Sequence, residues 1–236
     1  LIDDILNNYS TNNYVTNLVD NIDIWINPLA NPDGTFAGGN NTVFGATRSN
    51  ANNIDLNRNY PDPQDGLHPD GNSWQPETMI FMGLADTVNF NLASNLHTGS
   101  VVANYPWDTW SNIPADLNWW EHVCNEYSDT CQLNGNQNYF TDFDNGITNG
   151  FDWYEVDGGR QDYSNYFNHS REFTLELSNS KTPNPNTLPY YWNANFSSFY
   201  NFIQQSLYGL RGIVTDSITG QPLKAFVEVI NHDVDS

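Results

Sequence analysis

The sequence has 236 residues, of which 38% are hydrophobic and 14% aromatic, which is enough for a sizeable core. Acidic side chains number 28 and basic ones 7, for a formal net charge of -21. This balance argues against nucleic acid and anionic membranes as partners, because both require a basic surface. No run of about 18 apolar residues occurs, so no membrane span is encoded.

The first half of the chain predicts a strand, a long loop and a helix. Isoleucines alternate with other residues at positions 22, 24 and 26, a pattern that predicts a strand ending at Pro28. A loop rich in Gly and Asn follows at 31–53, and loops of this length are usually functional or mobile. Gln75-Pro76-Glu77-Thr78 then begins a helix that we expect to end near Val88, since proline favours the first turn.

Strands and helices alternate in the second half, which predicts an α/β domain. Residues 92–96 and 101–105 are predicted strands flanking His97-Thr98-Gly99, and apolar residues at 173, 175 and 177 mark another. Helices predicted at 116–127 and 188–207 would cover the sheet. The expected fold is a mixed central sheet with helices on both faces. After Tyr208, segments 210–215 and 225–230 around a turn at 220–222 predict a β-hairpin that begins a separate all-β module.

Two cysteines, Cys124 and Cys131, leave the redox compartment open. Seven positions apart on a continuous helix, they would lie about 10 Å from each other, beyond the reach of a disulfide. A bridge would require the helix to break near Ser128.

Several polar residues are candidates for chemistry. Arg58 and Arg48 are scarce cations, and together with Asn57 they could bind a carboxylate; the alternative is that Arg58 forms a structural bridge to an acid. His97, at a strand end beside small residues, suits a ligand or base, although an isolated histidine is more often structural.

The strand 172–177 alternates apolar and polar residues, so Glu172, Thr174 and Glu176 share one face. Partial burial of Glu176 would raise its pKa toward that of a general base. The competing interpretation, a solvated face of an edge strand, is slightly favoured by the pattern alone.

Tyr154 and the pair His169 and Glu172 are two further candidates. Tyr154 lies on a loop before Gly158-Gly159 and could swing, or it could be an ordinary packed aromatic. His169 and Glu172 have the spacing of a zinc motif, but the segment enters a strand, where residues three apart point to opposite faces. We therefore do not expect this pair to bind metal.

In combination, these motifs resemble the zinc metallocarboxypeptidases, in the branch related to carboxypeptidases D, E, M and N. The similarity covers residues 1–207, and residues 208–236 resemble the start of the transthyretin-like β-sandwich domain that follows the catalytic domain in that branch. The motifs that carry it occur in family order: Asn31-Pro32-Asp33-Gly34, Asp55-Leu56-Asn57-Arg58-Asn59, Gln75-Pro76-Glu77-Thr78, Asn95-Leu96-His97, Gly158-Gly159-Arg160-Gln161-Asp162 and Thr174-Leu175-Glu176-Leu177.

The resemblance implies a role for each site residue. His97 is the third ligand of one catalytic zinc ion, and Glu176 is the general base. Arg48 polarises the scissile carbonyl, and Asn57 and Arg58 hold the C-terminal carboxylate of the substrate. Tyr154 is the mobile tyrosine that closes over the substrate. The reaction implied is metal-assisted removal of the C-terminal residue of a peptide or protein.

The resemblance also leaves a gap in the zinc site. The other two ligands of the family lie in a His-x-x-Glu motif ahead of the helix with which this chain begins, and catalytic zinc needs three protein ligands. We expect the chain to be a fragment of a longer enzyme, with little zinc binding or activity as given. The alternatives are an inactive peptide-binding module, which would keep Asn57, Arg58 and Asp108, and a purely structural acidic secreted domain.

Specificity and localisation follow from the same resemblance. The branch removes C-terminal Lys or Arg, and the matching pocket residues are Asp108 and Gln161. A carboxylate and an amide oxygen can pair with a cation. Arg160 would repel one if it entered the pocket, but we expect it to point away, as neighbours in an extended segment do. The acidic composition and the transthyretin-like segment indicate an extracellular or periplasmic protein.

Overall fold

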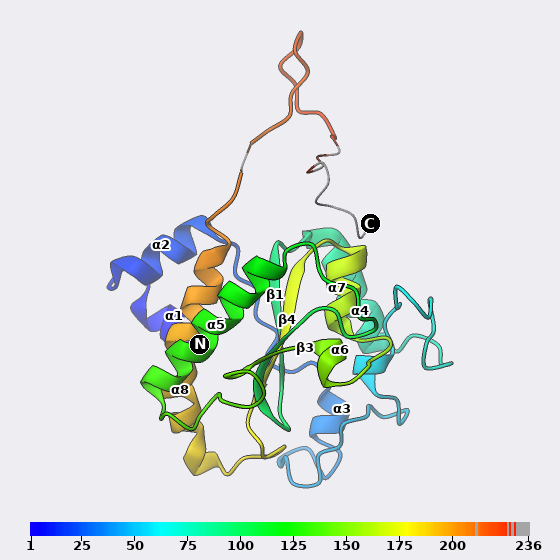
Figure 1. Cartoon of the computed structure of the whole chain (residues 1–236), viewed down its shortest axis with the longest axis vertical. Helices are drawn as coiled ribbons and strands as arrows, with labels where there is room; N and C mark the ends of the chain where they lie inside the picture. Colours follow the sequence, from blue (N-terminus) through cyan, green and yellow to red (C-terminus); the bar gives the residue numbers. More distant parts are fainter. Residues whose placement is uncertain (211, 226, 228, 230–236) are drawn as a thin grey trace.

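The computed structural model of the chain describes residues 1–210, 212–225, 227 and 229 (Figure 1). Four strands and eight α-helices are assigned in this part of the chain. In chain order they are α1 (Ile2–Asn8), α2 (Asn13–Asn21), α3 (Pro32–Thr35), α4 (Pro76–Val88), β1 (Leu92–His97), β2 (Val101–Tyr105), α5 (Leu117–Asn134), β3 (Ile147–Asn149), α6 (Gly150–Trp153), α7 (Arg160–Phe167), β4 (Arg171–Leu177) and α8 (Leu188–Gln205). No helix among the described residues is long and apolar enough to cross a membrane.

The strands form one mixed sheet in the order β1-β4-β2-β3. β4 runs parallel to β1 and antiparallel to β2, while β2 and β3 are parallel. β4 is therefore an interior strand, hydrogen-bonded along both sides. The edge-strand interpretation of this segment is wrong, because sequence alternation cannot reveal which strands lie beside it.

The odd-numbered residues of β4 build the core. Phe173 and Leu175 are fully buried in one cluster with α5 and α8. The ring of Phe173 lies 4.5 Å from that of Phe202 and 6.3 Å from that of Trp120, measured between centroids. The side chains of α5 and α8 thus cover one face of the sheet.

The even-numbered residues of β4 face the other way, toward α7. Ser164 donates to Glu172 Oε2 at 2.8 Å, and Asn165 donates to the Glu172 carbonyl at 2.7 Å. Helices therefore cover both faces of a mixed sheet, as the sequence predicted. A smaller cluster packs α1 and α2 against α8 through Val15, Leu18 and Tyr200.

The predicted strand at 22–26 is wrong. The backbone after α2 is extended, but no strand of the described residues hydrogen-bonds to it. Trp25 is 59% exposed and Ile26 39%. Alternation gives a segment the side-chain pattern of a strand, whereas a ladder also needs a neighbouring chain segment.

The fifth helix is longer than predicted. α5 continues past Tyr127 to Asn134 without a break at Ser128. Cys124 and Cys131 are accordingly free and buried, and burial raises the pKa of both thiols. Such thiols are unreactive, since the nucleophilic form is the thiolate.

The segment after α8 projects away from the α/β body (Figure 1). Thr215 and Pro222 form an isolated antiparallel bridge, and Leu223 donates its N–H to the Val214 carbonyl at 2.9 Å. The reversal is closed by a bond from Gly220 N–H to the Asp216 carbonyl, somewhat earlier than the predicted turn at 220–222. Positions 226, 228 and 230 of the predicted second strand lie outside the described residues.

We expect Phe173→Ala to lower the free energy of unfolding by about 3–5 kcal/mol, because it leaves a cavity between the sheet, α5 and α8. Leu133→Ala is the matched control, since Leu133 lies on α5 but is 85% exposed, and its effect should stay within about 0.5 kcal/mol. Urea unfolding followed by circular dichroism measures both. Equal losses in the two variants would contradict this placement of the core.

Candidate active site

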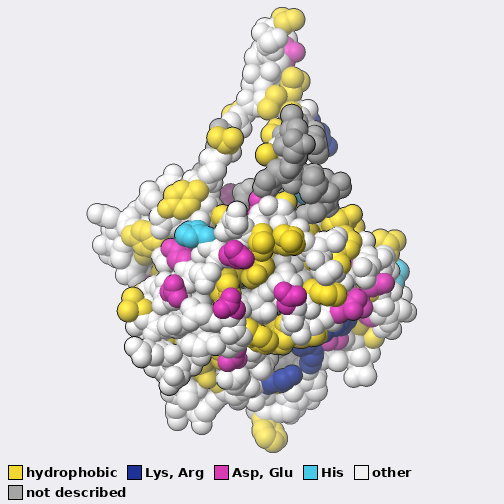
Figure 2. Space-filling model, viewed as in Figure 1, with side chains coloured by type: hydrophobic (Ala, Val, Ile, Leu, Met, Phe, Trp, Pro, Cys, Tyr) yellow, Lys and Arg dark blue, Asp and Glu magenta, His cyan; other side chains and the backbone are white. Residues whose placement is uncertain are grey.

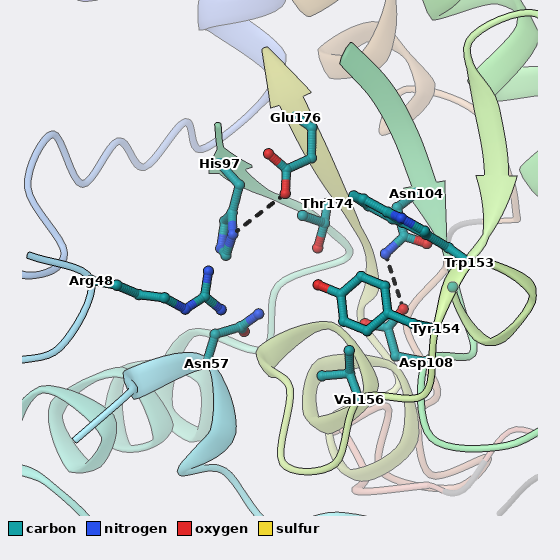
Figure 3. Close-up of a pocket in the computed structure, with 11 residues that line it drawn as sticks. Arg48, Asn57, His97, Asn104, Asp108, Trp153, Tyr154, Val156, Thr174 and Glu176 are labelled. Atoms are coloured by element: carbon teal, nitrogen blue, oxygen red, sulfur yellow. Dashed lines mark hydrogen bonds and ion pairs between the residues drawn. The ribbon is translucent and has the colours of Figure 1, made fainter. Parts of the chain in front are cut away.

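A small pocket, open at its mouth, lies at the ends of β1 and β4 (Figure 3). Strands, the loop before η1 (Leu56–Arg58) and the α6 region all contribute to its walls. The lining residues are Arg48, Asn57, His97, Asn104, Asp108, Gly150, Trp153, Tyr154, Val156, Thr174 and Glu176. Six of the eight site residues expected from the sequence are in this set; Arg58 and Gln161 contact residues that are.

Strand pairing brings His97 and Glu176 together. The two are register partners in the parallel β1–β4 pair, so their side chains share a face. His97 Nδ1 lies 3.9 Å from Glu176 Oε1, and the amide nitrogen of Asn95 lies 3.0 Å from His97 Nε2. Burial, followed by the charge of Arg48, lowers the pKa of His97 to about 4. The imidazole is therefore neutral at pH 7, the form that binds metals.

Glu176 is the carboxylate best placed to act as a base. Its side chain is 10% exposed, and its Oε2 atom is buried with no hydrogen-bond partner in the described part of the chain. Burial raises the pKa of Glu176, while Arg48 opposes the shift. An unpartnered carboxylate oxygen facing a pocket is free to accept a proton from water.

The loop that holds Arg48 and Asn57 is organised by Asp55. Arg48 Nε donates to Asp55 Oδ2 at 2.6 Å, and Asp55 Oδ1 accepts the backbone N–H of Asn57 at 3.0 Å. Arg58 Nη1 donates to the Asn57 carbonyl at 2.7 Å, and no ion pair of Arg58 occurs among the described residues. The ion pair with an acid that was the alternative role for Arg58 is formed by Arg48 instead, with Asp55.

Asp108 forms the floor of the pocket and is 4% exposed. Its Oδ1 accepts hydrogen bonds from the amides of Asn104 at 3.0 Å and Gln161 at 3.1 Å. The oxygens of these two amides are buried, and none of the described residues donates a hydrogen bond to them. A Cβ on Gly150 would lie 1.7 Å from Asp108 Oδ1, so this close approach requires glycine.

Two more buried carboxylates hold the floor in place. Asp162 accepts the backbone N–H groups of Asp108 at 2.9 Å and Thr109 at 2.8 Å. Asp62 accepts the Thr109 hydroxyl and the Gly158 N–H, both at 2.9 Å. Burial raises the pKa of Asp108 to about 6 and that of Asp162 well above its usual value, since both carboxyls lose water and repel each other.

Arg160 points away from the pocket, as predicted, but for a different reason. It is the first residue of helix α7, not part of an extended segment. Its Nε donates to Glu172 Oε1 at 2.7 Å, which turns the guanidinium behind the site. Arg160 and Ser164 together donate to both carboxylate oxygens of Glu172. The His169/Glu172 pair is therefore not arranged as a metal site.

Tyr154 lies at the rim of the pocket and is 47% exposed. Its ring contacts the edge of Trp153 at 5.1 Å between centroids. Figure 3 shows its hydroxyl directed into the pocket. The residue is therefore neither a buried core aromatic nor remote from the site.

Cations are concentrated at this site in an otherwise acidic protein. Four of the seven Lys and Arg residues, Arg48, Arg58, Arg160 and Lys181, lie near enough to influence His97 or Glu176. On the face drawn in Figure 2, acidic side chains are spread widely, while the cations of the α/β body gather below the centre. Cations gathered on one side of a pocket attract an anionic group of a ligand.

Sequence reasoning missed Asn104, Asp62 and Asp162 as parts of the site. Asn104 pairs with Thr174 across β2 and β4, which places both side chains in the pocket. Its signal was a polar residue inside the buried strand Val101–Tyr105. The two aspartates act through backbone groups distant in sequence, and no local pattern marks them.

Known proteins resemble this chain over nearly its whole length. Residues 1–198 match the zinc carboxypeptidase family. The chain is 35% identical over 249 residues to carboxypeptidase M of Mus musculus, covering 97% of this chain and 54% of that protein. The chain belongs to the zinc carboxypeptidase family. It is also 37% identical over 252 residues to carboxypeptidase D of Homo sapiens, covering 99% of this chain and 18% of that protein.

Solved structures of this family share the fold. Thrombin activatable fibrinolysis inhibitor superposes with a TM-score of 0.63 at 16% identity, covering 86% of this chain and 55% of that one. Carboxypeptidase A from Helicoverpa armigera gives a TM-score of 0.51 at 19% identity, covering 73% of this chain and 48% of that one. This chain therefore spans about half the length of these relatives and of carboxypeptidase M.

The zinc ion implied by the family finds one fitting ligand here. The neutral, half-buried imidazole of His97 suits the metal, with Asn95 beside its Nε2. Within the described residues, no three His, Cys, Asp or Glu side chains gather closely enough to hold an ion.

The raised pKa of Asp108 predicts how stability depends on pH. Between its usual pKa of 3.8 and about 6, the folded carboxyl keeps a proton that the unfolded one has lost, so its stabilising effect is present at low pH and disappears as pH rises through about 6. Asp108→Asn should raise the free energy of unfolding at pH 7.5 by about 1–3 kcal/mol and change it little at pH 4. Urea unfolding at the two pH values measures this. A destabilised variant at pH 7.5 would refute the assignment.

Proposed function

We propose that this chain carries the substrate-binding and proton-transfer residues of a carboxypeptidase that removes C-terminal Lys or Arg from peptides and proteins. The observation that supports this best is the floor of the pocket, where buried hydrogen-bond acceptors outnumber donors. A buried acceptor without a donor costs free energy, and a ligand that supplies donors relieves that cost.

Three acceptor groups lie at the floor or directly behind it. Asp108 is a buried carboxylate, and the amide oxygens of Asn104 and Gln161 are buried without a hydrogen-bond partner among the described residues. A guanidinium offers five N–H donors and an ammonium three, and neither accepts hydrogen bonds. An apolar side chain would leave these acceptors unsatisfied, and an acidic one would be repelled by Asp108. The pocket therefore suits a cationic side chain.

The opposite wall suits a carboxylate. Arg48 and Asn57 line it, with Arg58 directly behind Asn57. Guanidinium and amide N–H groups form charge-assisted hydrogen bonds to a carboxylate, so a free C-terminus is the group recognised. A cation site and a carboxylate site on one pocket match the two ends of a C-terminal Lys or Arg residue.

Glu176 would perform the proton transfers of peptide hydrolysis. Its unpartnered Oε2 accepts a proton from the attacking water and then gives it to the leaving amine. Arg48 stabilises the negative charge that develops on the scissile carbonyl oxygen. Tyr154, exposed at the rim, closes over the bound substrate and excludes water. Zinc, when bound through His97 and two further ligands, supplies Lewis-acid chemistry at the same carbonyl.

The remaining assignments are also proposals. Residues 208–236 begin a transthyretin-like domain, supported by the reversal at Thr215 and Pro222. With the acidic surface, that domain favours an extracellular or periplasmic location.

Because the described residues offer one zinc ligand, the 236-residue chain alone should bind zinc weakly and have little activity. An inactive peptide-binding module remains the second candidate, and the next experiment separates the two.

Glu176→Gln should lower kcat by at least about 1,000-fold while leaving KM within about 3-fold, because the carboxylate acts in the transition state more than in binding. The measurement requires a protein that combines this chain with a complete set of three zinc ligands. If wild-type protein binds peptides without cleaving them, the binding module is correct. Variant turnover within a few-fold of wild type would remove Glu176 from its role.

Asp108→Ala should lower kcat/KM at least about 100-fold on peptides ending in Arg or Lys and change it little on a peptide ending in Leu. The physical reason is that a cation at the floor of the pocket loses the carboxylate that pairs with it. Asp116→Ala is the control, since Asp116 pairs with Arg171 away from the pocket.

The wild-type protein decides the specificity directly. It should prefer the Arg peptide over the Leu and Glu peptides by a large factor. Equal or faster hydrolysis of the Leu or Glu peptide would disprove the basic-residue assignment.

A further inference from the structure

We infer that Arg160 is a positioning residue: through its ion pair with Glu172 it holds the amide nitrogen of Asn57 toward the α-carboxylate of the bound substrate. The inference rests on the proposed function, in which Asn57 binds that carboxylate. It concerns a residue that does not line the pocket and touches no substrate.

The Arg160 side chain is fixed on three sides behind the site. Its Nε donates to Glu172 Oε1 at 2.7 Å, and its Nη2 donates to the Ser94 carbonyl at 3.2 Å. The guanidinium carbon lies 4.5 Å from the centre of the Phe81 ring, a cation–π distance. The side chains of Arg160 and Glu172 are only 15% and 0% exposed.

The position of Arg160 is not explained by the helix it begins. Arg160 is the first residue of α7, directly after the N-cap Gly159. A cation at a helix N-terminus is unfavourable, because the helix dipole is positive there. Glu172, fully buried, compensates by requiring a cation as its partner. The ion pair therefore determines where the start of α7 sits.

The backbone of the same residue reaches the pocket wall. The first N–H groups of a helix have no partner within it. The N–H of Arg160 donates instead to Asn57 Oδ1 at 3.0 Å. With its oxygen engaged, the amide of Asn57 can present only its two N–H donors to the pocket, and Figure 3 draws this amide beside Arg48 at the pocket's edge. A flipped amide would turn its oxygen toward the substrate carboxylate and repel it.

The same contacts link the carboxylate site to the strands of the proposed catalytic residues. Ser94 precedes His97 on β1, and Glu172 precedes Glu176 on β4. One side chain thus sets the separation between the group that anchors the substrate's end and the base. Catalysis is sensitive to that separation, since small misplacements of reacting groups cost large factors in rate.

The test uses a neutral replacement of the pair, R160M with E172Q, which leaves no buried charge unpaired. Its matched control is R171M with D116N, which neutralises the other ion pair made by β4. Calorimetry measures the affinity of the 236-residue chain for a peptide ending in Arg and for the same peptide with a C-terminal amide. We expect about a tenfold loss for the free acid, little change for the amide, and no change for either ligand in the control.

A double-mutant cycle separates positioning from general destabilisation. In an N57A background, R160M with E172Q should cause no further loss of affinity, because its effect passes through Asn57. R160K keeps a cation beside Glu172 but cannot also reach Ser94 and Phe81, so its affinity for the free-acid peptide should fall about threefold. In the N57A background it too should cause no further loss. R160K replaces the neutral pair in the test if that variant fails to fold. Unchanged affinity in a folded variant, or a loss that adds to that of N57A, would overturn the inference.

Failure of the proposed function gives a different result. If N57A alone leaves the preference for the free acid over the amide unchanged, Asn57 does not bind the carboxylate. If N57A abolishes the preference while both Arg160 variants keep it, only the positioning role of Arg160 is wrong.

Discussion

The pairing of β4 between β1 and β2 is the constraint on which the rest of the structure depends. Both edges of this strand are hydrogen-bonded, and helices cover both of its faces, α5 and α8 on one and α7 on the other. Phe173 and Leu175 occupy the face toward α5 and α8. Glu172, Thr174 and Glu176 are therefore buried on the opposite face, at 0%, 6% and 8% exposure. A polar face in the interior of a sheet is costly, and here each group on it either has a partner or lines the pocket.

Burial of like charges is the second cost, and the structure meets it in two ways. Glu172 is neutralised by Arg160, and Asp62 and Asp162 are hydrogen-bonded to backbone and hydroxyl groups. Asp108 accepts hydrogen bonds from two amides, and burial raises its pKa although the bond from Asn104 opposes the shift. Of these four acids, Asp108 is the one that lines the pocket, where a ligand can contribute. Functional sites commonly lower the stability of the folded protein, because their groups are arranged for a ligand.

The sequence predicted the elements with strong local signals. The helix beginning at Pro76 ends at Val88 as expected, because its first-turn proline and apolar spacing are local. The strand at 22–26 failed, since pairing is non-local, and α5 extended past its predicted end. The interior position of β4 was missed for the same reason. The alternation of apolar and polar residues along a strand does not show which other strands pair with it.

The candidate site was predicted mainly from the family motifs. His97, Glu176, Arg48, Asn57, Asp108 and Tyr154 meet around one pocket, although they are scattered over 129 positions of sequence from Arg48 to Glu176. The residues that support these side chains were not predicted. Asp162 binds the backbone of residues more than fifty positions away, and Arg160 acts through both its side chain and its N–H. Such roles depend on tertiary proximity, which no spacing rule in the sequence encodes.

The central claim is that the pocket floor is built for a cation. Calorimetry with two peptides, identical except that one ends in arginine and the other in citrulline, tests it most directly, because citrulline has nearly the same shape and a neutral urea group. Asp108 with two amide oxygens should favour the charged group by about 2 kcal/mol, roughly a 30-fold tighter Kd for the arginine peptide at pH 7.5. Equal affinities, or tighter binding of the citrulline peptide, would contradict the account.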